Sequence, residues 1–336
     1  MSGPVVFDGS ILAAGPVTGV AGSFLTTLAA YGIRMAAAGE RAPVLLVPDG
    51  VSAPHLPGVL MYPGPVGAVR KQLELPRLLR RLGARLFHAP VAAVPLRAGC
   101  PLVATVHDLP WHATEPLREA GCGWRHRLAV RLATRRAAAV LVPSQATADD
   151  VLLERRTANV RVVGHGVPLP DEPAPAANQR GPFLVLGDDR PRKNLIAVQA
   201  AHARAKSLVP DLPDLRICGP VHGYVSEAEK VALLRSSRAL LHVSLFEGFG
   251  LPVLEAFGHG LPVLCSDRKS LPEVAGDAAL IVDPTDVEAI AAAMVRIHQD
   301  EELRMRLRER GRTRAARLTP ETAAAAWQAL HREVAA

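Results

Sequence analysis

Residues 244–262 of the chain read SLFEGFGLPVLEAFGHGLP, and this stretch predicts a turn followed directly by a helix. The residues before it, Ala239–Val243, are apolar and predict a buried strand that runs into the turn. Gly248 and Gly250 hold the turn open, and Pro252 suits the first turn of the helix. Backbone N–H groups at the start of such a helix can bind an anion, with help from the helix dipole.

Two glutamates flank this helix start. Glu247 lies in the loop before the helix, and Glu255 lies about one turn inside it. A carboxylate only accepts hydrogen bonds, so two of them suit a ligand rich in hydroxyl groups, such as a sugar and a ribose. A loop glutamate and a helix-surface glutamate without a common task are the alternative. The glycines and prolines around them favour a shared binding site.

Short aliphatic runs alternate with helical stretches along the whole chain. The runs are apolar on both faces, which is typical of parallel strands covered by helices. The pattern predicts an α/β fold of two Rossmann-like, doubly wound domains. The predicted strands are Val5–Phe7, Val44–Val47, Arg85–His88, Leu102–Val106, Val140–Val142, Val160–Val163, Phe183–Leu186, Leu215–Cys218, Ala239–Val243, Pro262–Cys265 and Ala279–Val282.

A proline-rich segment separates the two halves. Residues 167–182 contain five prolines, which disfavour both helix and sheet pairing, so we predict a linker there. The predicted domains are residues 1–166, which would bind the acceptor, and residues 183–318, which would bind the nucleotide part of a ligand. Residues 319–336 have helical periodicity and are expected to form a C-terminal helix that packs back on the first domain. Two such domains face a cleft between the carboxyl ends of their sheets, where ligands bind in open α/β folds.

A second polar turn points to the same half of the chain. Residues 184–194 read LVLGDDRPRKN, a strand followed by a turn with the adjacent cations Arg192 and Lys193. Two cations at the start of the next helix can hold a diphosphate. A surface turn without a ligand is the alternative.

The first half offers one strong candidate. His107 follows the predicted buried strand Leu102–Val106 within the sequence VATVHDLPW of residues 103–111. A histidine at the carboxyl end of a strand is placed to face a ligand in the cleft. A capping or buried structural histidine is the alternative.

Together these segments resemble the signature of glycosyltransferase family 4, the retaining enzymes with the GT-B fold. The resemblance extends from about Val5 to Ala293 and is strongest over residues 183–284. It implies that Glu247 contacts the donor sugar and Glu255 the ribose of the nucleotide. It also implies that Arg192 and Lys193 neutralise the diphosphate leaving group and that His107 lies near the reacting sugar. The implied catalytic residues are His107, Glu247, Arg192 and Lys193.

The resemblance assigns further donor contacts. The donor-binding residues that it implies, beyond Arg192, Lys193, Glu247 and Glu255, are Gly19, Gly22, Gly248, Phe249, Gly250, Leu251, Tyr224 and Val225.

Two departures weaken parts of that assignment. Ser23 stands where the family usually has an arginine after its glycine loop, which removes a cationic contact. The segment between Gly219 and Ser226 is also shorter than usual. Because this segment lies near the base in the family, the base preference is not transferable.

Composition excludes some function classes. Apolar residues make up 49% of the 336 residues and charged residues 21%, as in a globular protein. The apolar runs are too short to span a bilayer, and the N-terminus does not have the pattern of a secretory signal, so a cytoplasmic location is expected. The net charge of +7 could indicate nucleic acid, but aromatic residues are only 4%, so few bases could stack. A basic surface near an acidic or membrane-bound acceptor stays open as an alternative.

The sequence therefore predicts a retaining glycosyltransferase that moves a sugar from a nucleotide-diphosphate donor to an acceptor hydroxyl. A natural product, a polysaccharide or a lipid-linked molecule would each suit as acceptor. No Asp-x-Asp motif or clustered His/Asp set suits a divalent ion, so we expect neither a metal nor a further cofactor. An epimerase-like enzyme of the same fold and a non-catalytic nucleotide-sugar-binding protein are the alternatives; a nucleic-acid-binding protein is the remaining, weakest one.

Overall fold

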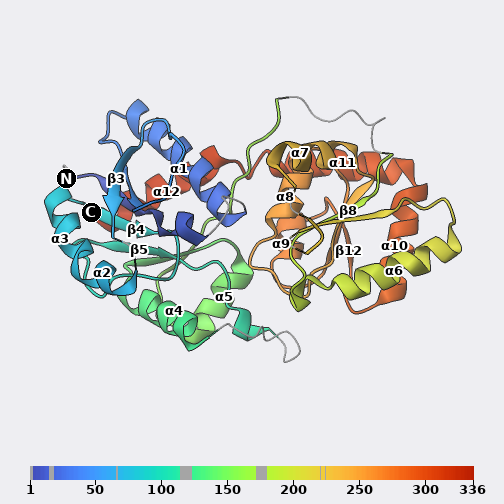
Figure 1. The fold of residues 1–336 in the computed structure, drawn as a ribbon, viewed down its shortest axis with the longest axis horizontal. Helices are drawn as coiled ribbons and strands as arrows, with labels where there is room; N and C mark the ends of the chain where they lie inside the picture. The colour runs from blue at the N-terminus through green and yellow to red at the C-terminus, as the bar shows by residue number, and fades with distance from the viewer. Residues whose placement is uncertain are drawn as a thin grey trace. The chain divides into compact units, whose positions relative to one another are not determined.

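The computed structural model of the chain describes residues 3–14, 19–65, 67–113, 123–171, 180–219, 221–223 and 225–336. Within these residues the chain forms two compact units. The first contains most residues up to Gly166 together with Pro320–Ala336, and the second contains Val167–Thr319. Figure 1 shows the elements of both units.

The described part of the first unit contains a seven-stranded parallel sheet of order β3-β2-β1-β4-β5-β6-β7. This is the doubly wound order, in which the chain reverses direction across the sheet between β1 and β4. The strands are β1 (Val5–Asp8), β2 (Val44–Pro48), β3 (Leu60–Gly64), β4 (Leu86–Ala89), β5 (Leu102–Thr105), β6 (Ala139–Val142) and β7 (Val160–Val162). Its helices are α1 (Val20–Ala37), α2 (Ala68–Leu73), α3 (Leu75–Leu82), α4 (Trp124–Arg136) and α5 (Gln145–Glu154), with short 3-10 turns at Gly9–Ala14 and Pro110–His112.

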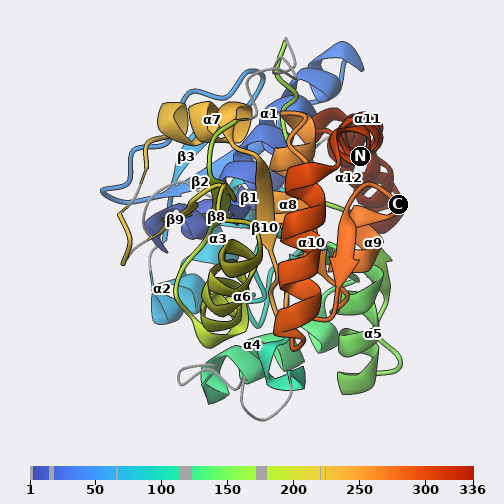
Figure 2. The same ribbon diagram turned by 90° about the vertical axis from the view of Figure 1, so that its right-hand side faces the viewer.

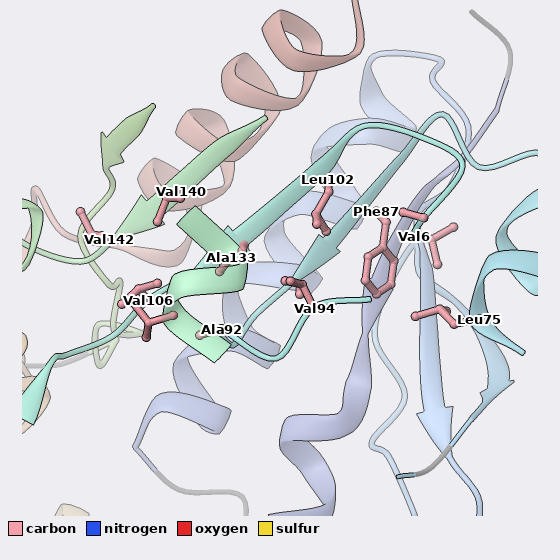
Figure 3. Close-up of a cluster of buried hydrophobic side chains, with 14 of the residues drawn as sticks. Val6, Leu75, Phe87, Ala92, Val94, Leu102, Val106, Ala133, Val140 and Val142 are labelled. Carbon is pink, nitrogen blue, oxygen red and sulfur yellow. The ribbon is translucent and has the colours of Figure 1, made fainter. Parts of the chain in front are cut away.

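Helices cover both faces of this sheet, as the two-sided apolar strands require. On one face Val6, Phe87 and Val140 of the strands pack against Leu75 of α3 and Ala133 of α4, as Figure 3 shows. On the other face the strands pack against α1 and against α12 (Pro320–Ala335). The strands β1, β2, β4, β5 and β6 are therefore buried on both sides.

The C-terminal helix α12 belongs to the first unit. It packs along α1, and Figure 1 shows it in red beside that blue helix. Trp327 of α12 is 7% exposed and lies over Phe7 of β1, with ring centroids 5.7 Å apart. Burial of aromatic surface of this kind contributes a large share of core stability. The last residues of the chain thus complete the core that its first strand begins.

The second unit contains a five-stranded parallel sheet, within the described residues, of order β12-β11-β10-β8-β9. The chain changes direction across this sheet between β8 and β10, which is the other common doubly wound order. The strands are β8 (Phe183–Leu186), β9 (Leu215–Cys218), β10 (Ala239–His242), β11 (Val263–Ser266) and β12 (Leu280–Val282). The helices are α6 (Leu195–Leu208), α7 (Glu227–Ser236), α8 (Leu251–Gly258), α9 (Leu271–Ala275), α10 (Val287–Gln299) and α11 (Glu301–Ala315), and a 3-10 turn spans Pro191–Lys193.

Helices α6 and α10 lie side by side on one face of this sheet, as Figure 2 shows. Their apolar residues Val198, Ile290 and Met294 pack on Leu241 of β10 and form the core there. Helix α8 follows β10 and packs against α11. The loop between β10 and α8 therefore emerges from a rigid part of the unit, at the carboxyl end of a central strand.

The α/β fold and the doubly wound arrangement predicted from the sequence are confirmed. Every predicted strand is present within about one residue at each end, but the prediction omitted β3. Its sequence, LMYPG, contains a proline and a glycine, and Leu60, Met61 and Tyr62 are 60%, 39% and 42% exposed. Its apolar run is short and ends at proline and glycine, residues that are typical of turns and edge strands.

No helix among the described residues combines the length and the apolar character that crossing a bilayer requires.

Candidate active site

The strands β8 and β10 bring two distant turns of the second unit together. They are neighbours in the sheet, on the two sides of the point where the chain changes direction. The turn after β8 carries Arg192 and Lys193, and the loop after β10 carries Glu247. Carboxyl ends of parallel strands at such a point form the usual ligand crevice of doubly wound folds.

Three basic side chains surround the Glu247 carboxylate. Lys193 Nζ donates to Glu247 Oε1 at 2.5 Å, and Arg192 Nη1 donates to Oε2 at 3.3 Å. His242 Nε2, at the end of β10, lies 3.1 Å from Oε1. The side chains of Glu247, Lys193 and Arg192 are only 9–12% exposed, so solvent screens these charges little.

Nearby charges and burial shift the pKa of Glu247 in opposite directions. Burial alone would raise its pKa, but Lys193, His242 and Arg192 outweigh it and hold the pKa well below the ordinary value. Burial lowers the pKa of His242, although Glu247 opposes this, so the imidazole is neutral at neutral pH. Arg192 and Lys193 together carry two positive charges against one carboxylate. Two cations therefore contact one carboxylate, in a place suited to an anion.

The loop after Glu247 is fixed by backbone geometry. Gly250 caps α8 with a φ of 105°, a conformation that side chains rarely adopt. A Cβ there would also lie 2.7 Å from Leu271 Cδ2. Ser270 Oγ donates to the Glu247 carbonyl at 2.9 Å and holds the start of the loop. Gly248, Phe249, Gly250 and Leu251 thus form a rigid turn into α8.

Glu255 of α8 has a different partner. Lys230 of α7 donates to its carboxylate at 2.9 Å and also lies 3.0 Å from the exposed Glu227. Burial raises the pKa of Glu255, and Lys230 only partly offsets this. The pKa of Lys230 is raised by Glu255 and Glu227, although burial acts in the opposite direction. Glu255 is thus a second, half-buried carboxylate, held by a cation that the sequence prediction did not include.

In the first unit, His107 lies just beyond β5. Its Nε2 is 2.7 Å from the carbonyl oxygen of Pro90, which can only accept, so Nε2 carries the proton. Nδ1 is buried without a hydrogen-bond partner in the described part of the chain. Burial lowers the pKa of His107, more than the Pro90 contact raises it. His107 is therefore neutral at neutral pH, with a free acceptor at Nδ1.

The ring of His107 is held by stacking. It lies against the ring of His165, with centroids 5.3 Å apart and planes 16° from parallel. His165 Nδ1 is 3.2 Å from Ser23 Oγ, which also donates to the carbonyl of Gly166 at 3.2 Å. Ser23, at the position where the family usually has arginine, thus links α1 to the segment that follows β7.

Comparison with known proteins agrees with these features. Residues 24–171 match the family described as Glycosyltransferase Family 4, and residues 220–314 match Glycosyl transferases group 1. The chain belongs to the family 4 glycosyltransferases. This confirms the family indicated by the sequence motifs.

Two curated relatives of this glycosyltransferase are mannosyltransferases. O-antigen chain mannosyltransferase B of Escherichia coli is 45% identical over 93 residues, which are 28% of this chain and 24% of that protein. MMP alpha-(1->4)-mannosyltransferase of Mycolicibacterium hassiacum is 29% identical over 255 residues, 65% of this chain and 62% of that protein. The chain thus spans about a quarter and about three fifths of these two relatives.

Solved structures share the fold of the glycosyltransferase. Sucrose-phosphate synthase from Thermosynechococcus elongatus superposes with a TM-score of 0.74 and 18% identity over 98% of both chains. HepE of Anabaena, in complex with UDP-glucose, superposes with a TM-score of 0.72 and 16% identity over 98% of this chain and all of that one. At these identities the likeness establishes the two-domain GT-B fold.

The glycosyltransferase places its predicted site residues in two groups. Arg192, Lys193, Glu247 and the Gly248–Leu251 loop are gathered in the second unit at the β8–β10 crevice, and Glu255 lies in the helix that follows. His107 lies in the first unit. Gly19 caps α1 with a φ of 53°, whereas Gly22 lies inside its first turn rather than in a loop. Val225 directly precedes the cap of α7, and Tyr224 lies outside the described residues.

Three residues of the site were missed. His242 could have been noticed as a histidine at the end of an otherwise apolar strand. Lys230 and Ser23 gave no such signal, because their partners Glu255 and His165 lie 25 and 142 residues away in the sequence. Among the described residues no three histidine, cysteine, aspartate or glutamate side chains gather in a metal-binding arrangement.

Proposed function

We propose that the chain transfers a sugar from a nucleotide-diphosphate donor to an acceptor hydroxyl, with retention of configuration and without a metal or other cofactor. The observation that carries this proposal is the Arg192–Lys193–Glu247 cluster at the carboxyl ends of β8 and β10. Its two adjacent cations suit a diphosphate, and its carboxylate suits sugar hydroxyls. One cluster therefore supplies partners for both parts of such a donor.

The donor would replace contacts that exist within the protein. The diphosphate oxygens would compete with Glu247 for Lys193 and Arg192, and Glu247 would then accept hydrogen bonds from the donor sugar. The ribose hydroxyls would similarly compete with Lys230 for Glu255, which lies 2.9 Å from that amine. The backbone of the rigid turn Gly248–Leu251 would approach the donor at the start of α8.

The chemical step breaks the bond between the anomeric carbon and the diphosphate oxygen and forms a bond from the acceptor oxygen to that carbon. The leaving diphosphate gains negative charge in the transition state, which Arg192 and Lys193 stabilise. We propose that a diphosphate oxygen takes the proton of the acceptor hydroxyl, so that attack and departure occur on the same face. A covalent sugar–protein intermediate, detected by mass spectrometry of the intact protein during turnover, would refute this step.

His107 would act in this reaction as a hydrogen-bond acceptor. Its proton is fixed on Nε2 by the Pro90 carbonyl, so Nδ1 can accept from a hydroxyl. A neutral imidazole with one fixed tautomer can orient a hydroxyl without bringing a competing charge near the diphosphate.

Calorimetric titration with a panel of nucleotide sugars tests the proposal. The mannosyltransferase relatives favour nucleoside-diphosphate mannose donors as the first members of the panel, with UDP-glucose beside them. We expect saturable binding of one donor, with an affinity about tenfold or more lower in Glu255→Ala, because a hydrogen bond to a charged group contributes about 1.5–3 kcal/mol. Lys206→Ala is the matched control, since Lys206 lies near the far end of α6 and is 40% exposed. If no donor binds, or if Glu255→Ala binds the donor like the wild type, the proposed site is wrong.

The Lys230–Glu255 pair gives a pH prediction. Burial already raises the pKa of Glu255, and Lys230 is the main group that opposes this rise. In Lys230→Met the pKa should rise further, so Glu255 takes up a proton at a higher pH and loses its capacity to accept two hydrogen bonds from a ribose. We therefore expect donor affinity to fall as the pH is lowered, and this fall to begin at a higher pH in Lys230→Met than in the wild type.

Calorimetry at several pH values between about 5 and 8 checks this, because this range lies above the ordinary glutamate pKa and covers an upward shift. Glu227→Gln is the control, since Glu227 contacts the same lysine but its side chain is 73% exposed. Identical pH profiles in the wild type and Lys230→Met would mean that Glu255 does not need to be ionised for the donor to bind.

A further inference from the structure

A basic hollow lies in the first unit, apart from His107. It measures about 280 Å³ and is bordered on one side by Asp49 and Pro63–Pro65. On the other side are Arg70 of α2, Arg77 and Arg81 of α3, and Glu74, which lies between the two helices. Pro63 and Gly64 end β3, and Asp49 directly follows β2. The hollow is therefore at the carboxyl edge of the sheet, the edge at which doubly wound folds bind ligands.

The arginines of the hollow differ in their partners. Arg70 is engaged by Glu74, at 2.8 Å and 2.9 Å, and by Asp49 at 3.4 Å. Arg77 and Arg81 lie one helical turn apart on α3, and both are exposed. In the part of the chain that the structure describes, neither forms an ion pair or a side-chain hydrogen bond. The hollow thus contains three guanidinium groups against two carboxylates, and two of the three are uncommitted.

The wall formed by α2 is anchored. Lys71 Nζ donates to Asp8 Oδ2 at 2.5 Å and to Ser10 Oγ at 2.7 Å. The two charged side chains are 12% and 7% exposed, and Asp8 also accepts from the backbone of Ser10 at 2.9 Å. A buried, hydrogen-bonded ion pair of this kind is costly to break. Arg70, the neighbour of Lys71, is therefore held at the edge of the sheet.

We propose that this hollow binds a phosphate group of the acceptor. This proposal rests on the proposed function, since it names the chemistry of the acceptor. A phosphate has up to two negative charges and three acceptor oxygens, which match two uncommitted guanidinium groups. A single carboxylate could be satisfied by one of them. The volume, near the lower end for ligand pockets, suits a phosphate with a small attached group.

The position of the hollow implies an extended acceptor. From β2 to β5, the strand that leads to His107, the order is β2-β1-β4-β5. Three strand spacings correspond to about 14 Å. If the accepting hydroxyl is near His107, the phosphate binds farther away than one sugar ring can reach. The acceptor is then a chain with its phosphate remote from the hydroxyl that receives the sugar.

Exposed apolar side chains adjoin lining residues of the hollow in the sequence. Val69 and Leu73 of α2 are 71% and 60% exposed, and Tyr62 of β3 is 42% exposed. Exposed apolar groups beside a phosphate site suit a phosphate attached to a lipid, although a free sugar phosphate has the same charged group. Both sources are distinguished by the experiment below.

Binding of glucose 6-phosphate, measured by calorimetry on the full chain, tests the site. We expect it to bind the wild type, while glucose does not bind, and to bind Arg77→Gln/Arg81→Gln at least about tenfold more weakly. The control is Arg80→Gln/Arg135→Gln, which removes the same charge from exposed positions outside the hollow and should change the affinity less than about twofold by screening.

The second arm uses sedimentation with phosphatidylcholine vesicles, with and without phosphatidate. Binding that requires phosphatidate and is lost in Arg77→Gln/Arg81→Gln, without binding of glucose 6-phosphate, places the phosphate on a lipid. Binding of neither probe, or equal loss in the control pair, overturns the proposal. Donor titration of the same variants separates the two proposals, because the hollow is in the other unit. If no donor binds while phosphate binding still depends on Arg77 and Arg81, the phosphate site stands and the transferase assignment fails.

Discussion

Replacing Lys193 with methionine should lower kcat/KM of sugar transfer by about 10²–10³-fold, the range found when one group that stabilises developing negative charge is removed. Lys193 lies at the end of the 3-10 turn that precedes α6, and its amine is 2.5 Å from Glu247. In the proposed reaction it faces the leaving diphosphate, whose charge increases in the transition state. We therefore expect kcat to fall with kcat/KM, and donor affinity to fall less.

The same substitution also disturbs the protein itself. Removing one partner of a buried ion pair costs about 3–5 kcal/mol, and the remaining Arg192 should keep the loss near the lower end. Reduced stability alone could therefore lower activity. The double variant Lys193→Met/Glu247→Gln removes both charges of this pair, and the new amide oxygen can still accept from Arg192. We expect it to regain most of the free energy of unfolding, measured in urea, but none of the activity.

The outcomes distinguish two roles for the lysine. If activity is still absent in a stable double variant, the charges act on the substrates. If the double variant recovers activity together with stability, Lys193 only compensates Glu247, and both residues lose their proposed catalytic roles. Lys206→Met, at an exposed position 13 residues along the same helical segment, controls for loss of charge.

Much of the fold is predictable because the buried strands have a strong local pattern. Strands such as β6 and β8 are covered on both sides, so their sequences are continuously apolar. β3 was not predicted, because most of its residues are exposed and its last two are Pro63 and Gly64. No single segment of the sequence determines the order of the strands in the sheet. It follows from which helix covers which face, and thus from contacts between distant residues.

The candidate site, like the fold, was predictable from the sequence only in part. Glu247, Glu255, Arg192 and Lys193 were found because each lies at the end of a strand or the start of a helix, where polar residues interrupt an apolar pattern. The partners that set their charge state were not found. Whether Lys230 meets Glu255 depends on how α7 packs beside α8, and its sequence neighbours do not indicate this.

A second large effect is expected on the stability of the first unit in weak acid. A buried chain of hydrogen-bonding groups crosses its core. Tyr31 Oη lies 3.0 Å from His331 Nδ1, His331 Nε2 lies 3.1 Å from His88 Nδ1, and His88 Nε2 lies 3.1 Å from Thr105 Oγ1. With both imidazoles neutral, each contact has one donor and one acceptor. Protonation of both imidazoles would set two N–H groups against each other between the histidines.

The pKa values agree with this geometry. Burial lowers the pKa of His88 to about 3, with a smaller contribution from His107, and it lowers the pKa of His165 to about 3 in the same way. The pKa of His331 is also well below its ordinary value, by burial first and then by His88 and Arg85. In the unfolded chain all three histidines titrate near pH 6.5. Below that pH the unfolded state binds more protons than the folded state, so stability falls as the pH falls from 6.5 toward 3.

The slope is about 1.4 kcal/mol per pH unit for each histidine once its unfolded form is protonated. Between pH 6.5 and 5, His88, His165 and His331 together should therefore cost about 5 kcal/mol, which is comparable to the whole stability of many domains. Carboxylates with lowered pKa values add to the loss mainly at still lower pH, below about 4.5. The window from pH 6.5 to 5 thus isolates the histidines.

Urea unfolding followed by tryptophan fluorescence measures the stability of the first unit. All three tryptophans belong to that unit: Trp111, Trp124 and Trp327. His331→Gln should lower stability at pH 7 and reduce the pH slope by about one proton, since glutamine cannot titrate. His55→Gln, at an exposed position of the same unit, should leave the slope unchanged. A slope in His331→Gln equal to that of the wild type would show that His331 takes up its proton equally in the folded and the unfolded chain. The hydrogen-bond chain would then tolerate a proton on His331, and acid would not weaken the packing of α12 through this residue.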